Sequence, residues 1–242
     1  MPKKSIPRWS RRKDARPAEV TKAALALFVE RGYAATRLED VAQRAGVSKG
    51  TLYLYFESKE ELFKAVVREG LVPVLEQGER MLSEHQGDSA SLIRALALGW
   101  WEMVGNTPFG GIPKLMFAEC RNFPELGKFY YDEVISRGHR LIQEAVSRGM
   151  QSEEFRRLDL DYVTQLIIAP LVLQAIWRHS FDFCDTHRLD PTKYVEQHVD
   201  LLLVGLRSAG KKRSPRYPKK VSQRVPRRSA RQATLRATRE DQ

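Results

Sequence analysis

The residues best placed to contact another molecule lie in one short stretch, GVSKGTLYLYF at positions 46–56. If this stretch is helical, one arc of about 140° holds Lys49, Gly50, Tyr53 and Leu54. This arc offers an ammonium group, a glycine that lets the backbone come close, and a phenol. Leu52 and Phe56 lie about 40° apart on another arc. One side of the helix is therefore suited to packing, and the other to contacting phosphates and base edges.

The elements that would hold this arc are a turn and two capped helices. Gly46 can take the left-handed conformation that ends a helix, and Ser48 can accept a hydrogen bond from a free backbone N–H of the next helix. Ser58 and Glu61 form a capping box for the helix that follows. Lys59 then falls in the first turn of that helix, where it and the free N–H groups can hold a phosphate.

Two more helices are predicted before this stretch. Thr36 and Glu39 form a second capping box, and apolar residues then recur at the spacing of a short amphipathic helix. The same spacing also occurs earlier, in a helix closed by Gly32. The two apolar sets are Leu38, Val41, Ala42 and Ala45, and, earlier, Val20, Ala24, Leu27 and Phe28. Three helices with a shared core and a glycine turn have the layout of a helix-turn-helix, whose second helix enters the major groove.

Three segments carry a resemblance to a known family: residues 28–33 (FVERGY), 36–42 (TRLEDVA) and 45–62 (AGVSKGTLYLYFESKEEL). They resemble the amino-terminal domain of TetR-type transcriptional regulators, and they cover about the first quarter of the chain. The resemblance implies an all-α fold, with an N-terminal three-helix helix-turn-helix DNA-binding domain and a C-terminal helical ligand-binding and dimerisation domain. It also implies a homodimer that reads a palindromic operator in double-stranded DNA and binds a small effector.

The family's DNA-contacting positions can be carried over residue by residue. The base-reading positions fall on Lys49 and Gly50, and the backbone-contacting positions fall on Thr51, Tyr53, Tyr55 and Lys59. Thr36 is a further expected phosphate contact. Arg37 departs from the family, which often has a small hydroxylated residue there, so it either adds a contact or lies in solvent. For Tyr53 the alternative is a half-buried aromatic, and for Lys49 it is a solvated lysine.

The net positive charge of the chain comes from its two ends. The formal net charge of the 242 residues is +11. Residues 1–16 contribute +6 and residues 209–242 contribute +10, which leaves −5 for residues 17–208. These limits predict a basic flexible arm (1–16) and a basic disordered tail (209–242). Between them, the resemblance implies a helix-turn-helix domain (17–76, motif about 37–56) and a helical effector-binding and dimerisation domain (77–208). The arm either follows the minor groove or is a solvated tail, and the C-terminal tail either clamps DNA or keeps the protein soluble.

Several functional classes are disfavoured by what the sequence contains. It has two cysteines, no signal-peptide pattern, no metal-binding spacing and no common catalytic motif, so we expect a cytoplasmic protein that is not an enzyme and needs no metal or cofactor. The longest apolar run, at 166–173, is far shorter than the about 20 residues that cross a bilayer, so no membrane is expected.

The rest of the chain is predicted to be helical. A long helix at 59–82 would link the domains, with Pro73 bending or dividing it. The segment 159–180 is apolar all round, which predicts a helix buried on every side. Asp190 and Pro191 mark the start of a final helix. By resemblance, these last two helices pack against those of a second copy as a four-helix bundle; the alternative is that they fold back on their own domain.

The middle of the chain is rich in aromatic residues, as expected of a small-molecule site. The candidates for an effector pocket are Trp100, Met103, Phe117, Tyr130, Gln174, Trp177 and Arg178. The alternative is that most of these aromatics simply fill the core. We expect a sequence-specific regulator, a repressor released by a small, largely apolar effector. A competing hypothesis is a sequence-indifferent nucleic-acid-binding protein driven by its basic tails.

Overall fold

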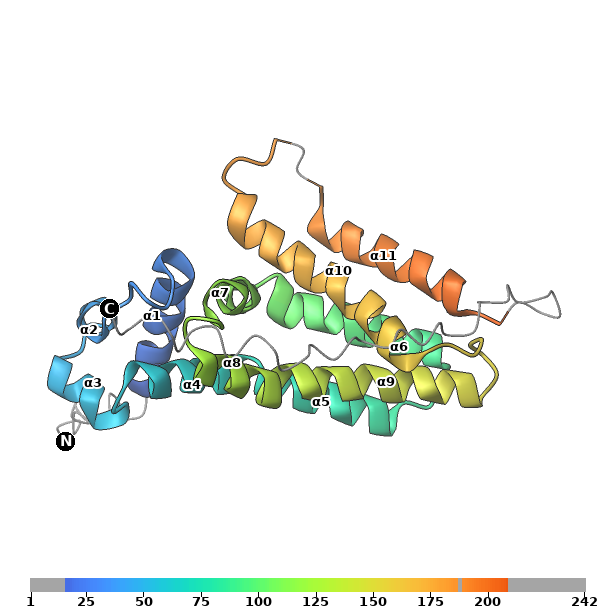
Figure 1. Cartoon of the computed structure of the whole chain (residues 1–242), viewed down its shortest axis with the longest axis horizontal. Coiled ribbons are helices and arrows are strands. Elements are labelled where there is room, and N and C mark those ends of the chain that lie inside the picture. The colour runs from blue at the N-terminus through green and yellow to red at the C-terminus, as the bar shows by residue number, and fades with distance from the viewer. Residues whose placement is uncertain (1–15, 187–188, 209–242) are drawn as a thin grey trace, which may run out of the picture. The chain divides into compact units, whose positions relative to one another are not determined.

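The computed structural model describes residues 16–186 and 189–208, and these residues form helices without a β-strand (Figure 1). The helices are α1 (Arg16–Arg31), α2 (Leu38–Arg44), α3 (Lys49–Tyr55), α4 (Lys59–Gly70), α5 (Val72–Glu84), α6 (Ser89–Trp100), α7 (Gly111–Glu119), α8 (Pro124–Tyr130), α9 (Ser136–Gln151), α10 (Leu160–Phe181) and α11 (Pro191–Leu206). Three short elements complete the list: η2 (Trp101–Gly105) and η4 (Tyr131–Ile135) are π-helical, and η3 (Pro108–Gly110) is a 3₁₀ turn. The prediction of an all-α fold is confirmed. The basic arm and tail lie outside the described residues, apart from Arg16.

The local signals that end and begin helices are where the sequence placed them. Gly32 and Gly46 have φ of +87° and +67°, a region that favours glycine. The hydroxyl of Ser48 accepts a hydrogen bond from the backbone N–H of Thr51, and that of Ser58 accepts one from Glu61. Asp190 caps α11 in the same way, with Pro191 in its first turn.

The predicted cap of α2 is wrong by one residue. Arg37 occupies the N-cap position and makes no side-chain capping bond. Thr36 is 1% exposed, and its hydroxyl lies 2.8 Å from the carbonyl oxygen of Gly32 and 3.2 Å from that of Leu27. Its hydroxyl therefore ties the preceding turn to α1, because the chain folds back on itself at Gly32.

The predicted linking helix is divided into α4 and α5 at Leu71. Pro73 lies in the first turn of α5, where its missing N–H costs little, since that N–H would have no partner within α5. The core of the first four helices continues into α7 and α8. Phe28, Leu52 and Phe63 belong to the same buried cluster as Ile112 and Leu126. Helices α7 and α8 therefore pack directly against α1 and α4, so a movement of α7 or α8 reaches the helices that hold α3 in place.

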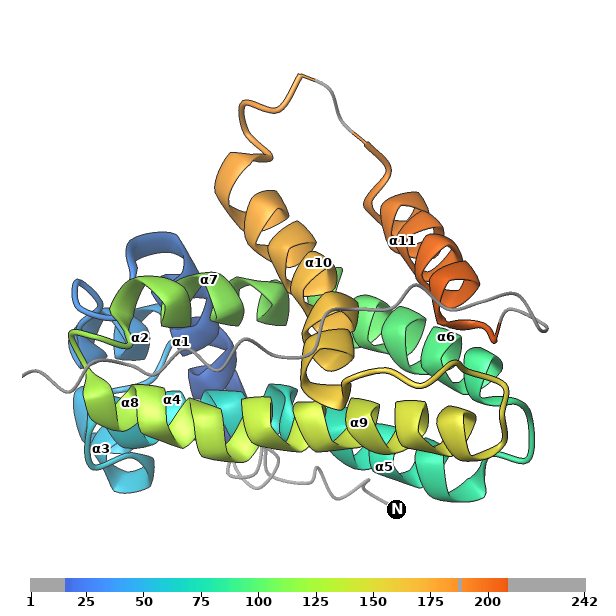
Figure 2. The same ribbon diagram turned by 45° about the vertical axis from the view of Figure 1, so that its right-hand side comes forward.

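The prediction that α10 is buried on every side is wrong for a single chain. One face packs on α7 and α9, through residues such as Ile167 and Leu171. The other face is exposed, and it carries Tyr162, Leu166, Leu173, Trp177 and Phe181. Figure 2 shows α10 running at a steep angle to α9 and meeting it at one end, with α11 next to α10. By length and composition alone, this 22-residue helix is apolar enough to cross a membrane, but apolar core helices of soluble proteins have the same properties. Uniform apolarity in the sequence does not show which neighbour covers each side.

Candidate nucleic-acid interface and effector cavity

Helix α3 has the two-sided character that its sequence predicts. Leu52 is fully buried and Phe56 is nearly so, in the core shared with α1 and α4. Lys49, Gly50 and Tyr53 are exposed on the other side. A Cβ added at Gly50 would come no closer than 3.9 Å to any other atom, so the backbone there is open to a close approach. Thr51 is partly buried and shares a hydrogen bond of 2.8 Å with the hydroxyl of Ser48.

Leu54 is the exposed residue of this helix that the functional prediction left out. Its side chain is 78% exposed, although it is the most apolar group on the outer arc. In the major groove, an apolar side chain can contact the C5 methyl group of thymine. The signal was present in the sequence, since Leu54 shares its arc with Lys49 and Tyr53, but exposure depends on the absence of a covering neighbour.

Lys49 is joined to α2 by an ion pair. Its ammonium nitrogen lies 2.5 Å from a carboxylate oxygen of Glu39 and 5.7 Å from the ring centre of Tyr53. The hydrogen bond that Lys49 donates to Glu39 raises the pKa of Lys49, and the same bond lowers the pKa of Glu39. Both side chains are therefore charged at neutral pH while they face solvent.

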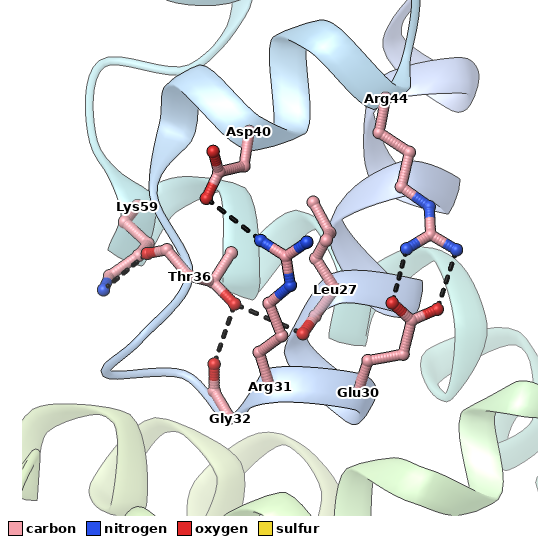
Figure 3. A network of polar contacts seen from close by, with 8 residues as sticks. All are labelled: Leu27, Glu30, Arg31, Gly32, Thr36, Asp40, Arg44 and Lys59. Atoms are coloured by element: carbon pink, nitrogen blue, oxygen red, sulfur yellow. Dashed lines mark hydrogen bonds and ion pairs between the residues drawn. The ribbon is translucent and has the colours of Figure 1, made fainter.

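Two of the residues predicted to contact phosphates have internal hydrogen bonds (Figure 3). The hydroxyl of Thr36 is buried against α1, as described above. The ammonium of Lys59 donates to the carbonyl oxygens of Tyr33, Ala34 and Thr36, at 2.8, 3.1 and 3.0 Å. It also lies 4.5 Å from the ring centre of Tyr33, and burial lowers its pKa. All three N–H bonds of Lys59 are thus used to hold the 33–36 turn in this structure, and its phosphate contact stays a prediction.

Ion pairs set the position of α2 against α1 (Figure 3). The guanidinium of Arg44 donates to both carboxylate oxygens of Glu30, at 2.6 and 2.7 Å, and Arg31 lies 3.3 Å from Asp40. The bond from Arg44 lowers the pKa of Glu30. A bidentate pair of this kind has a defined geometry even where it is exposed. Arg37 is exposed beside this network, and Tyr55 is 37% exposed at the end of α3.

A cavity of about 150 Å³ lies between α5, α6, α9 and α10. It brings together three of the predicted effector residues, Trp100, Met103 and Tyr130. It is also lined by residues that the sequence did not indicate, among them Val134, Ile135, His139, Ile167 and Leu171. These residues are on three separate elements, and no local pattern indicates that they meet.

Four predicted effector residues do not line the cavity. Phe117 is 75% exposed on α7, and Gln174 lies elsewhere on α10. The indole N–H of Trp177 donates to Asp185 at 3.0 Å, and Arg178 donates to the side-chain oxygen of Asn106. Gln174 and Arg178 share the helical stripe of Ile167 and Leu171, but they lie further towards the C-terminal end of α10, past the residues that line the cavity. Trp177 lies on a different side of the helix.

The cavity is nearly all apolar, and its walls include two irregular turns. The π-helical turns η2 and η4 contribute Met103, Val134 and Ile135. Such turns are frequent at functional sites, because they displace side chains from the regular helical positions. Burial raises the pKa of Tyr130, whose hydroxyl has no hydrogen-bond partner within residues 16–186 and 189–208. Tyr130 and His139 are thus the polar groups available to orient a ligand there.

Comparison with known proteins agrees with this geometry. Residues 20–66 match the sequence model described as bacterial regulatory proteins, tetR family. A relative, the uncharacterized HTH-type transcriptional regulator YfiR of Bacillus subtilis (strain 168), is 32% identical over 147 residues, which are 57% of this chain and 68% of the relative.

Solved structures share the whole fold. FadR from Bacillus subtilis, solved in complex with stearoyl-CoA, superposes with a TM-score of 0.66 at 21% identity, over 78% of this chain and 99% of that one. FadR from Bacillus halodurans, a fatty acid degradation regulator, superposes with a TM-score of 0.68 at 24% identity, over 85% of this chain and 99% of that one.

The helix-turn-helix with its exposed second helix, followed by a helical domain with a cavity, defines a DNA-binding transcriptional regulator. The chain belongs to the TetR family of these regulators. As members of this family are transcriptional regulators, the protein is not an enzyme.

Proposed function

We propose that this regulator is a repressor that binds a palindromic operator and is released from it by a small, largely apolar effector. The observation that carries the proposal is α3. Its buried Leu52 anchors the helix, while Lys49, Gly50 and Tyr53 face outward together. Lysine at the start of a recognition helix is suited to the O6 and N7 acceptors of guanine. Arg37 and Tyr55 are placed to add contacts beside it.

The palindrome follows from a proposed homodimer. The described part of α10 and α11 exposes a set of large apolar side chains: Tyr162, Leu166, Leu173, Trp177, Phe181, Leu201 and Val204. Soluble proteins rarely leave so many such groups on one pair of helices uncovered. A second copy covers this face in the proposal, and the two α3 helices then read two half-sites related by the same two-fold axis.

The proposed effector is largely apolar because the cavity is. A dry cavity of about 150 Å³ is the size that accommodates benzene. An acyl chain as long as that in the FadR complex would require the cavity to widen, for example by moving α10 away from α9. Tyr130 and His139 would then orient a polar end of the ligand.

A connected set of contacts links this cavity to α4, whose first turn follows α3 directly. Arg68 of α4 lies 3.6 Å from Glu133 of η4 and 5.1 Å from the ring of Phe129 in α8. The ring of Phe109 fills the space beside Gly70, where an added Cβ would lie 2.0 Å from it. A ligand that binds more tightly to one position of η4 will therefore shift α4, and with it the spacing of the two recognition helices.

The experiment is a selection of bound sequences from random duplex DNA, followed by a screen for apolar compounds that release the protein. The proposal predicts one enriched palindrome, which a chain without residues 209–242 still prefers. The competing hypothesis of binding by basic tails predicts similar affinity for all duplexes and loss of most binding when the tail is removed. A repressor of this kind acts where the DNA is, in the cytoplasm.

A further inference from the structure

Glu39 places a negative charge on the surface that faces DNA in the proposed function. It lies in the first turn of α2, and its carboxylate is 2.5 Å from the ammonium of Lys49 at the start of α3. Both side chains are more than half exposed. An acidic group near phosphates weakens binding to every duplex, so its presence there needs a reason other than affinity.

Four other carboxylates of this region hold the scaffold. Glu30 and Asp40 connect α1 with α2 through Arg44 and Arg31. Glu60 and Glu61 both pair with Lys64 within α4. Among these five carboxylates, Glu39 alone contacts the recognition helix. Exposed pairs add little to the stability of a fold, so fold stability does not explain Glu39 either.

We propose that Glu39 is a specificity-determining residue, which positions Lys49 to read guanine. The inference rests on the proposed function. An ammonium has three N–H donors. One is used on Glu39, and two remain for the O6 and N7 acceptors of guanine. The carboxylate also keeps the flexible lysine from folding onto the nearest phosphate, since that move would break the ion pair.

Specificity is a difference between two affinities, and a group can raise it by weakening the wrong complex. With Glu39 in place, Lys49 gains a good partner only where a guanine lies opposite. On other sequences the ammonium stays on Glu39, and the carboxylate repels the DNA backbone. Glu39 therefore lowers affinity for all duplexes and lowers it least for the operator.

The test compares Glu39→Gln with Asp40→Asn in the full chain. Both changes remove one negative charge from the first turn of α2, but Asp40 pairs with Arg31 and does not contact α3. Glu39→Gln is expected to bind a scrambled duplex more tightly, with a log–log salt slope steeper by up to about 0.9. Its preference for guanine at the position read by Lys49 is expected to fall roughly tenfold. Asp40→Asn is expected to keep that preference.

A second comparison separates positioning from charge. In a Lys49→Gln background, Glu39→Gln is expected to leave base preference unchanged, because the lysine it positions is gone. Glu39→Gln and the parent protein are expected to have equal melting temperatures by circular dichroism. A fall in guanine preference is then caused by altered contacts with DNA and not by a loss of stability. Unchanged guanine preference in Glu39→Gln, or the same loss in Asp40→Asn, overturns the inference while the proposed function stands. A parent protein that selects no sequence at all overturns both.

Discussion

Replacement of Lys59 by Met tests whether this lysine holds the 33–36 turn or contacts DNA. The change keeps the length of the apolar stem and removes three hydrogen bonds to backbone carbonyl oxygens. The bond to Ala34 is exposed, so water replaces it. The bonds to Tyr33 and Thr36 are partly buried, and each carries a charged donor. At about 1–1.5 kcal/mol for each partly buried bond, the free energy of unfolding is expected to fall by about 2–3 kcal/mol.

The matched control is Lys64→Met in the same helix. Lys64 pairs with Glu60 and Glu61 within α4, and such pairs contribute less than about 1 kcal/mol. Urea unfolding of both variants gives the two free energies, and titration of the selected duplex gives the salt slope. The reasoning is refuted if Lys59→Met unfolds like the parent and yet loses operator affinity with a salt slope lower by about 0.9, as a phosphate contact would.

Three further predictions concern the outer arc of α3, the dimer and the response to acid. Replacing single thymines of the operator with deoxyuridine removes only the C5 methyl group. At one position this change should weaken operator binding by the parent protein but not by Leu54→Ala. Equal losses of affinity for both proteins would exclude a methyl contact. Leu166→Asp should weaken dimerisation by roughly 3 kcal/mol in sedimentation, because it places an unpaired charge in the proposed interface, whereas Tyr131→Asp, at an exposed site on η4, should not. The pKa of Glu30 is lowered by Arg44, so the folded state binds fewer protons than the unfolded chain. Its contribution to stability is present above the ordinary pKa of 4.5 and is lost as pH falls through the lowered value. The free energy of unfolding of Glu30→Gln should therefore change less with pH in that acid range than that of the parent protein. An identical pH dependence of the two proteins would contradict this.

The sequence by itself determined the features that depend on near neighbours. Gly32 and Gly46 end helices because of their own backbone conformation, and Ser48, Ser58 and Asp190 cap helices through N–H groups two or three residues away. The same is true of the two sides of α3, because the helical repeat places Leu52 opposite the outer arc. These local features, together with the family resemblance, were enough for the all-α fold and the class of protein.

Contacts between distant residues were decided only by the tertiary structure. Lys59 and Tyr33 are 26 positions apart, and nothing near Lys59 indicates that its ammonium turns inward. The cavity draws its lining from six α-helices, α5 to α10, and two π-helical turns, so Phe117 and Trp177 matched its composition without lining it. The exposed side of α10 is a third case. The sequence pattern shows which residues are apolar and at what spacing they recur. The role of each residue depends on which distant group the fold brings against it.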